Sequence, residues 1–284
     1  MTISALSVAQ ASHVNIHALG RDLSIEHVWI NPENTAAPLL VFMHEGLGSV
    51  AMWKDWPAEA CAALGCRGLV FSRYGYGSST PRPPKERWPV TYMHTQARDA
   101  LPALFQALGL QNEKPILFGH SDGGSIALLY AAMYPDAVQA IVVAAPHIFV
   151  EDISISSIEG ARRAYLDTDL PAKLKRYHKD PDSAFWGWND VWLDPEFRAW
   201  NIEEYLGSIR CPVLAIQGEN DEYGSLEQIR GIQRHAAQTR LCIIPDCRHS
   251  PHKDQPELML AAMVEFIRNP SLGFACEGSW DEAR

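Results

Sequence analysis

The stretch PILFGHSDGGSIALLYAAM, residues 115–133, decides the fold of this chain. Its opening run, PILFG, is typical of a buried strand, and a helical pattern follows over 121–134. Between them lies Gly119-His120-Ser121-Asp122-Gly123, a G-x-S-x-G motif at a strand-to-helix turn. A serine at the apex of such a turn has a strained backbone, and small residues on either side avoid clashes while its hydroxyl projects above the sheet. The motif therefore predicts a nucleophilic serine at position 121.

Short β-branched or aromatic runs recur along the chain and alternate with helical patterns. The predicted strands are residues 26–30, 39–43, 68–72, 115–119, 140–145, 212–217 and 241–245. The predicted helices are residues 53–65, 91–109, 121–134, 225–237 and 256–268. Several of the strand-like runs are apolar at nearly every position, as in strands that helices cover on both faces. The sequence thus predicts an α/β fold, with a mostly parallel β-sheet and helices on both of its faces.

The alternation of strands and helices stops from His147 to Arg210 and resumes at Pro212. Four of the nine Trp residues fall in this stretch, at positions 186, 188, 192 and 200. A helical insert explains the pattern better than two consecutive domains, because strands from both sides of the insert are needed to complete one sheet. We expect a core formed by residues 1–146 and 211–284, an insert at 147–210, and a frayed tail after Asn269.

The composition is that of a globular chain with an acidic excess. The 24 Lys and Arg against 34 Asp and Glu give a net charge of −10, which repels nucleic acid and anionic membranes. No run of 18 apolar residues occurs, the N-terminal residues lack a signal-peptide pattern, and the six Cys have no CxxC spacing. We expect a cytoplasmic protein with reduced thiols whose partner is a small-molecule substrate rather than nucleic acid or a membrane. No pattern in the sequence specifies an oligomeric state.

A serine nucleophile needs a base and an orienting acid, and in this topology each should follow a later strand. Asp221 is the first carboxylate well past the end of the strand at 212–217, and His249 follows the strand at 241–245. The chain order Ser121, Asp221, His249 fits a catalytic triad.

Other polar residues near these positions remain alternatives. His252 is a second candidate base, but His249 precedes the turn at Pro251, whereas His252 is expected to point toward the start of the last helix. A metal site at His249, His252 and Asp254 is disfavoured, because the HxxH spacing is not the HExxH pair of a zinc helix. The turn after residues 39–43 has no GxGxxG, which disfavours a dinucleotide-binding fold. Neither a metal nor a cofactor is expected. The alternative acids are Asp152, Glu219 and Glu222.

Over nearly its whole length the chain resembles α/β-hydrolase-fold enzymes. The landmarks that carry the resemblance are His44-Glu45-Gly46-Leu47-Gly48-Ser49 with Trp53, Arg73-Tyr74-Gly75-Tyr76-Gly77-Ser78, the motif at Ser121, Asp221, and His249 with Pro256-Glu257. The resemblance implies an oxyanion hole made by the backbone N–H groups of Gly46 and Asp122, and it implies that the insert is a helical lid over the nucleophile. The side chain of Asp122 is expected to cap the helix that follows it.

Two positions depart from the family pattern. Glu45 stands where a Gly usually follows His44, and Ser72 stands where an Asp is common at the end of the strand. A carboxylate beside an oxyanion hole opposes the charge of the intermediate. Glu45 is therefore expected either to point away, toward Arg73, or to contact the substrate.

Together the motif and the resemblance predict a serine hydrolase that cleaves a carboxylic ester or thioester of a small apolar or aromatic acyl group through an acyl-enzyme. A C–C bond hydrolase of aromatic ring-cleavage products is an alternative within the family. A ligand-binding receptor or pseudoenzyme on the same fold is an alternative of another class. At least one Trp of the insert is expected to contact the acyl group, while others pack within the insert. The candidate substrate-binding residues are Glu45, Trp186, Trp188 and Trp192.

Overall fold

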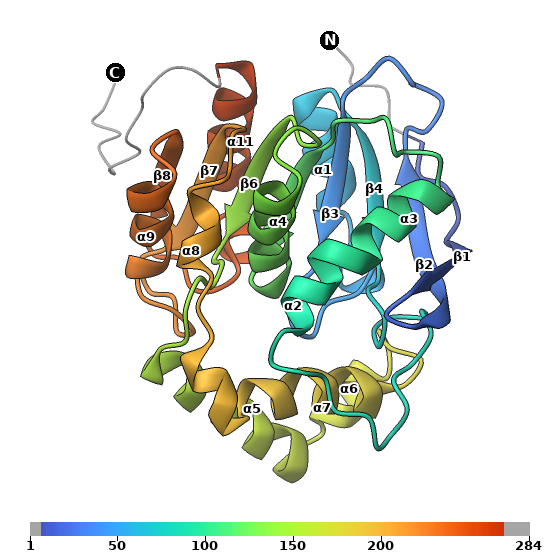
Figure 1. The fold of residues 1–284 in the computed structure, drawn as a ribbon, viewed down its shortest axis with the longest axis vertical. Coiled ribbons are helices and arrows are strands. Elements are labelled where there is room, and N and C mark those ends of the chain that lie inside the picture. Colours follow the sequence, from blue (N-terminus) through green and yellow to red (C-terminus); the bar gives the residue numbers. More distant parts are fainter. Residues whose placement is uncertain (1–6, 270–284) are drawn as a thin grey trace.

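The computed structural model describes residues 7–269, and the predicted frayed tail after Asn269 lies outside that range. Eight strands form one sheet in the order β1-β2-β4-β3-β5-β6-β7-β8 (Figure 1). The strands are β1 (Ser12–Ala18), β2 (Arg21–Ile30), β3 (Leu39–Met43), β4 (Arg67–Phe71), β5 (Ile116–His120), β6 (Ala140–Ala144), β7 (Val213–Gly218) and β8 (Thr239–Ile244). The β1–β2 and β2–β4 pairs are antiparallel, and all other pairs are parallel.

The alternation of side chains along the strands divides the core between the two faces of the sheet. In β3, Leu39, Val41 and Met43 belong to one apolar cluster, and Leu40 and Phe42 belong to the other. Helices α1 (Trp56–Leu64) and α11 (Pro256–Arg268) cover the Phe42 face. The opposite face is covered by α3 (Leu101–Ala107), α4 (Asp122–Met133) and α9 (Glu227–His235). Helices on both faces explain the apolar strands and confirm the predicted fold class.

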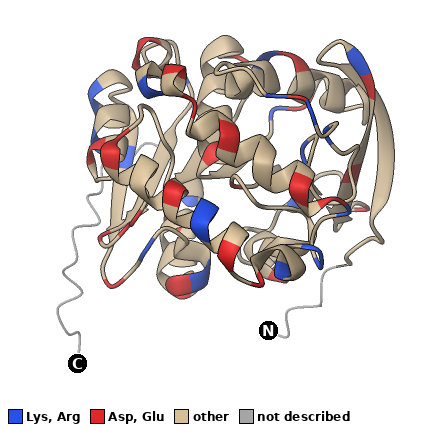
Figure 2. Cartoon of the chain, turned by 90° about the horizontal axis from the view of Figure 1, so that it is seen from below, with Lys and Arg blue, Asp and Glu red and all other residues tan. Residues whose placement is uncertain are grey.

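Residues 147–210, which we call the β6–β7 segment, contain helices and no strand of the sheet. These helices are α5 (Asp152–Asp167), α6 (Leu170–Leu174), α7 (Pro181–Trp192), η3 (Pro195–Ala199) and α8 (Glu203–Leu206). Figure 1 places α5, α6 and α7 together beyond one end of the sheet. Seen from that end, acidic and basic residues are interspersed on these helices and do not gather by sign (Figure 2). None of the helices in residues 7–269 is long and apolar enough to cross a membrane.

The remaining helical elements are short. They are η1 (Ala51–Trp53), α2 (Tyr92–Thr95), η2 (Gln96–Ala100) and α10 (Pro251–Asp254). The predicted helix at 91–109 is thus three consecutive elements, with the π-helical η2 between α2 and α3.

The antiparallel edge of the sheet is larger than the sequence predicted. Strand β1 was not predicted, and β2 begins at Arg21 rather than at residue 26. Strand β1 pairs only with β2, and its burial alternates: His13 and His17 on one face are exposed, whereas Ile16 and Ala18 on the other are buried. An edge strand with two histidines and an asparagine lacks the continuous apolar run that identified the central strands.

Candidate active site

Ser121 lies at the turn between β5 and α4, in the strained conformation that the motif predicts. Its φ and ψ are 53° and −121°, in a region that non-glycine residues rarely adopt. A Cβ on Gly119 would lie 2.3 Å from the carbonyl oxygen of Gly123, and a Cβ on Gly123 would lie 2.1 Å from that of Met43. Both glycines are therefore required for the close approach of strand and helix that presents the serine.

Three predicted residues meet in a chain of hydrogen bonds. The Nε2 atom of His249 lies 3.0 Å from Oγ of Ser121, and its Nδ1 lies 2.8 Å from Oδ1 of Asp221. Because a carboxylate accepts hydrogen bonds, Nδ1 carries the proton and Nε2 is free to accept the serine proton. Asp221 also accepts the Tyr223 backbone N–H and the Gln217 side-chain amide. Burial raises the pKa of Asp221, but the hydrogen bond and charge of His249 outweigh it and leave that pKa below its usual value.

The alternative base and acids lie elsewhere. His252 packs against Trp53 and Trp56, and burial lowers its pKa to about 2. Asp152 has a side chain that is 93% exposed, and it pairs with Arg198 on the β6–β7 segment. Glu219 is exposed, and Glu222 instead accepts the backbone N–H of His249.

The proposed oxyanion donors are the backbone N–H groups of Gly46, which follows the end of β3, and of Asp122, which directly follows Ser121. Asp122 is the first residue of α4, where an N–H has no partner within the helix. Among the turn, loop and cap hydrogen bonds between backbone groups of residues 7–269, none uses the N–H of Gly46 or Asp122. Two free donors here are what an oxyanion hole requires.

The predicted helix-capping role of Asp122 is wrong. Its fully buried carboxylate accepts hydrogen bonds from the Tyr92 hydroxyl at 2.6 Å and the Trp192 indole at 3.2 Å, and the Arg73 guanidinium lies 3.7 Å away. Burial raises the pKa of Asp122, while the Arg73 charge and the two hydrogen bonds oppose that shift. A buried carboxylate is costly unless it is paired and hydrogen-bonded. These three partners supply that pairing for Asp122.

The carboxylate of Glu45 faces the ring of His120, the residue before Ser121, rather than Arg73. This carboxylate lies 3.6 Å from Nδ1 of His120, whose Nε2 contacts the backbone carbonyl of His249 at 2.7 Å. Burial raises the pKa of Glu45, but His120, and next the charges of Lys253 and His44, together bring it well below its usual value. Arg73 bonds the backbone carbonyl of Glu45 instead of its side chain.

The three tryptophans of α7 diverge. The indole of Trp188 lies against Gly46, whose Cβ would be 2.1 Å from its Nε1, and Trp192 bonds Asp122. Trp186 instead packs on Tyr165 and Phe185 inside the β6–β7 segment. Residues two apart on a helix lie about 200° apart and residues four apart about 40°, which explains why positions 188 and 192 share a face that 186 does not. The structure therefore brings Trp188 and Trp192 to the site and leaves Trp186 away from it.

His147 also reaches the site and was missed by sequence reasoning. Its ring centroid lies 4.9 Å from that of Trp192 and 5.8 Å from that of His249. Burial, and next the charge of His249, lower its pKa to about 3, so it is neutral at ordinary pH. Its place three residues after β6, at the carboxyl edge of the sheet, was the available signal.

Within residues 7–269, no group of three His, Cys, Asp or Glu is arranged to hold a metal ion.

Comparison with known proteins identifies the family of this chain. A model of the alpha/beta hydrolase family matches residues 40–262. The chain belongs to the alpha/beta hydrolase family. Among curated members, human serine hydrolase BPHL (Homo sapiens) is 27% identical over 196 residues, which cover 65% of this chain and 63% of that protein. The sn-1-specific diacylglycerol lipase ABHD11 of Danio rerio is 22% identical over 259 residues, covering 81% of this chain and 78% of the lipase.

Solved structures of the alpha/beta hydrolase fold superpose on nearly the whole chain. A thermophilic esterase from Thermogutta terrifontis has a TM-score of 0.70 at 21% identity, covering 93% of this chain and 100% of the esterase. The enol-lactonase of Burkholderia xenovorans LB400 has a TM-score of 0.67 at 15% identity, covering 89% and 99%. At these identities the likeness concerns the fold alone, and it confirms the predicted fold class.

Proposed function

We propose that this alpha/beta hydrolase is a serine hydrolase that cleaves a carboxylic ester or thioester through an acyl-enzyme. The observation that carries the proposal is the chain of hydrogen bonds from Ser121 through His249 to Asp221, at 3.0 and 2.8 Å. A base within hydrogen-bond reach of the nucleophile, itself held by an acid, is the arrangement that activates a serine. BPHL and ABHD11, named as a serine hydrolase and a lipase, support the same class.

The reaction follows from the positions of these groups. Oγ of Ser121 attacks the acyl carbonyl while Nε2 of His249 takes the hydroxyl proton, and Asp221 stabilises the imidazolium through Nδ1. The negative oxygen of the tetrahedral intermediate accepts the N–H groups of Gly46 and Asp122, each of which contributes about 3–4 kcal/mol in such sites. His249 then protonates the leaving alcohol or thiol. Water, deprotonated by the same histidine, releases the acyl group.

We further propose that residues 147–210 are a lid whose Trp188 and Trp192 line the acyl side of the site, so that the acyl group is small and apolar or aromatic. Trp188 is 6% exposed and lies on Gly46, directly beside the proposed oxyanion hole. Aromatic faces next to the reacting carbonyl favour apolar groups. Glu45 is not included in the acyl pocket, because its carboxylate is turned to His120.

A fluorophosphonate probe with mass spectrometry tests the nucleophile. Ser121 should carry the phosphonate, and Ser121→Ala should lose both labelling and nitrophenyl ester hydrolysis. A folded protein with unlabelled Ser121 would refute the hydrolase and leave the ligand-binding receptor as the explanation. Cleavage of a ring-cleavage diketone faster than esters would assign C–C bond hydrolysis instead.

A pair of matched variants on one helix tests the lid. Trp188→Ala should alter the preference between acetyl, hexanoyl and benzoyl nitrophenyl esters, because it removes a ring beside the oxyanion loop. Trp186→Ala removes an equal ring from the inside of the segment and should leave the preference unchanged. Equal preferences in both variants and the wild type would remove the lid's role in acyl selection.

A further inference from the structure

One peptide group joins the proposed oxyanion hole to a buried polar cluster. The N–H of the Glu45–Gly46 peptide is the proposed oxyanion donor, and the carbonyl of the same peptide is the oxygen of Glu45. That oxygen is contacted by Nδ1 of His44 at 2.7 Å, Nη2 of Arg73 at 2.9 Å and the backbone N–H of Gly48 at 3.1 Å. Three donors at the carbonyl end of a peptide polarise its N–H end, because hydrogen bonds in a chain strengthen one another.

The tautomer of His44 follows from the two shortest of its ring contacts. The backbone N–H of Arg73 donates to Nε2 of His44 at 3.0 Å, so Nε2 carries no proton. Nδ1 therefore carries the proton and donates to the Glu45 carbonyl. Burial, together with the nearby Arg73 charge, lowers the pKa of His44 well below its usual value and keeps this neutral tautomer. His44 thus acts on the peptide as a fixed donor.

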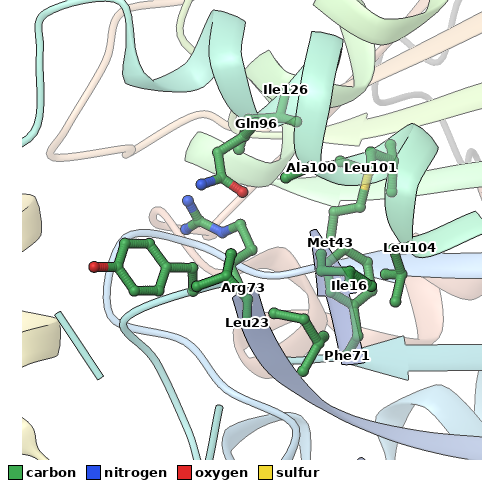
Figure 3. A pocket seen from close by; sticks show the side chains of 12 residues that line it. Ile16, Leu23, Met43, Phe71, Arg73, Gln96, Ala100, Leu101, Leu104 and Ile126 are labelled. Carbon is green, nitrogen blue, oxygen red and sulfur yellow. The ribbon is translucent and has the colours of Figure 1, made fainter. Parts of the chain in front are cut away.

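Arg73 is a buried cation directly behind this peptide. It is 2% exposed, donates to the carbonyls of His44 and Glu45, and lies 3.7 Å from the carboxylate of Asp122. Its guanidinium borders a cavity of about 20 Å³ that apolar side chains line, with the Gln96 amide beside it (Figure 3). Such a cavity has room for about one water molecule, so solvent screens the charge weakly.

We propose that Arg73 and His44 are positioning residues that polarise the Glu45–Gly46 peptide, and so strengthen the hydrogen bond from the Gly46 N–H to the oxyanion. The inference rests on the proposed serine hydrolase function and adds two side chains that never touch the substrate. Arg73 and His44 contribute when the carbonyl of the substrate becomes an oxyanion, because a preorganised donor stabilises the developing charge more than it stabilises the neutral substrate.

The position of Arg73 favours arginine over lysine. Its Nη2 atom donates to two successive backbone carbonyls while the same guanidinium lies near Asp122, whose own N–H is the second proposed donor. A planar guanidinium can hold several acceptors at fixed angles, whereas an ammonium supplies the charge without that geometry. Arg73→Lys should therefore restore part, but not all, of what Arg73→Met loses.

The first measurement is steady-state hydrolysis of p-nitrophenyl butyrate. Arg73→Met should lower kcat by about 10- to 100-fold with KM changed less than about 3-fold, which is less than the loss of a whole oxyanion donor. The matched control is Arg67→Met. Arg67 is also buried at 6% and ion-paired, with Glu113 at 2.7 Å, but it lies at the opposite end of β4 from Arg73. It should keep kcat within about 2-fold of the wild type.

The second measurement reads the oxyanion itself. Addition of Ser121 Oγ to a ¹³C-labelled aryl trifluoromethyl ketone forms an O–C bond, moves the carbonyl electron pair to oxygen, and transfers the serine proton to His249, with no leaving group. The ¹³C shift then titrates with the pKa of the hemiketal oxygen. In Arg73→Met that pKa should rise by about one unit for each tenfold loss of kcat, since both report stabilisation of the same oxyanion.

His44 provides the second route if Arg73→Met does not fold. His44→Leu removes the donor to the Glu45 carbonyl and should raise the hemiketal pKa, and His44→Asn, which retains an N–H near Nδ1, should restore it in part. A hemiketal pKa equal to that of the wild type in folded Arg73→Met or His44→Leu would overturn the inference, whatever the activity. If the wild type formed no hemiketal and Ser121 stayed unlabelled by fluorophosphonate, the proposed hydrolase function would fail first.

Discussion

The acid sensitivity of the fold should depend measurably on His252, a histidine that sequence reasoning considered as the base. His252 is 6% exposed, and burial lowers its pKa from 6.5 to about 2. Below pH 6.5 the unfolded chain binds a proton at this residue and the folded chain does not. The contribution of His252 to the free energy of unfolding is therefore at its full value above pH 6.5 and falls progressively as the pH falls toward 2. Between pH 7 and pH 5 this one residue should lower the free energy of unfolding by about 2 kcal/mol.

His252→Leu removes that proton and keeps an apolar side chain against Trp53 and Trp56. In urea unfolding followed by tryptophan fluorescence, the variant should lose about 2 kcal/mol less than the wild type between pH 7 and pH 5. Other buried histidines are common to both chains and cancel in this difference. An equal loss in both chains would refute the reasoning. Loss of esterase activity in a folded His252→Leu would restore His252 as a candidate base.

Two further predictions concern the serine turn and its contact with α7. Gly123→Ala would place a methyl group 2.1 Å from the Met43 carbonyl oxygen. Any folded variant should therefore react with fluorophosphonate about 100-fold more slowly. A wild-type rate of reaction would contradict the close approach of strand and helix. Trp192→Phe removes an indole donor from the buried Asp122 carboxylate and should lower the free energy of unfolding, measured in urea, by about 1.5–3 kcal/mol. An unchanged midpoint of urea unfolding would mean that the hydrogen bond contributes nothing to stability.

The central sheet and the order of the site residues were predictable because both depend on local pattern. Continuous apolar runs marked β3 and β5, and Gly123 is needed because a Cβ there would lie 2.1 Å from the Met43 carbonyl oxygen. Asp221 was identifiable because each later strand of a parallel sheet delivers its loop to the same edge. The apolar runs and the glycines of the motif are readable as local patterns in the sequence, and the position of Asp221 follows from the direction of a strand.

The orientation of buried polar side chains could not be predicted, because it depends on partners distant in sequence. Asp122 was expected to cap its own helix, but Tyr92 and Trp192, 30 and 70 residues away, provide its donors. The direction of Glu45 likewise depends on His120 at the end of the adjacent strand β5. The position of a residue in the sequence indicates which loop it occupies. Its hydrogen-bond and ion-pair partners depend on how that loop packs against other loops.

The same distinction explains why a carboxylate is tolerated beside the proposed oxyanion hole. Glu45 contributes its carbonyl to Arg73 on one side of the chain and its carboxylate to His120 on the other. The carboxylate thus lies against His120, whose ring contacts the backbone of His249, while Arg73 donates to the carbonyl of the peptide whose N–H is the proposed oxyanion donor. The electric field at an oxyanion depends most on the nearest charged groups. Glu45 can therefore be accommodated beside the proposed oxyanion hole, because its carboxylate and its backbone carbonyl face different partners.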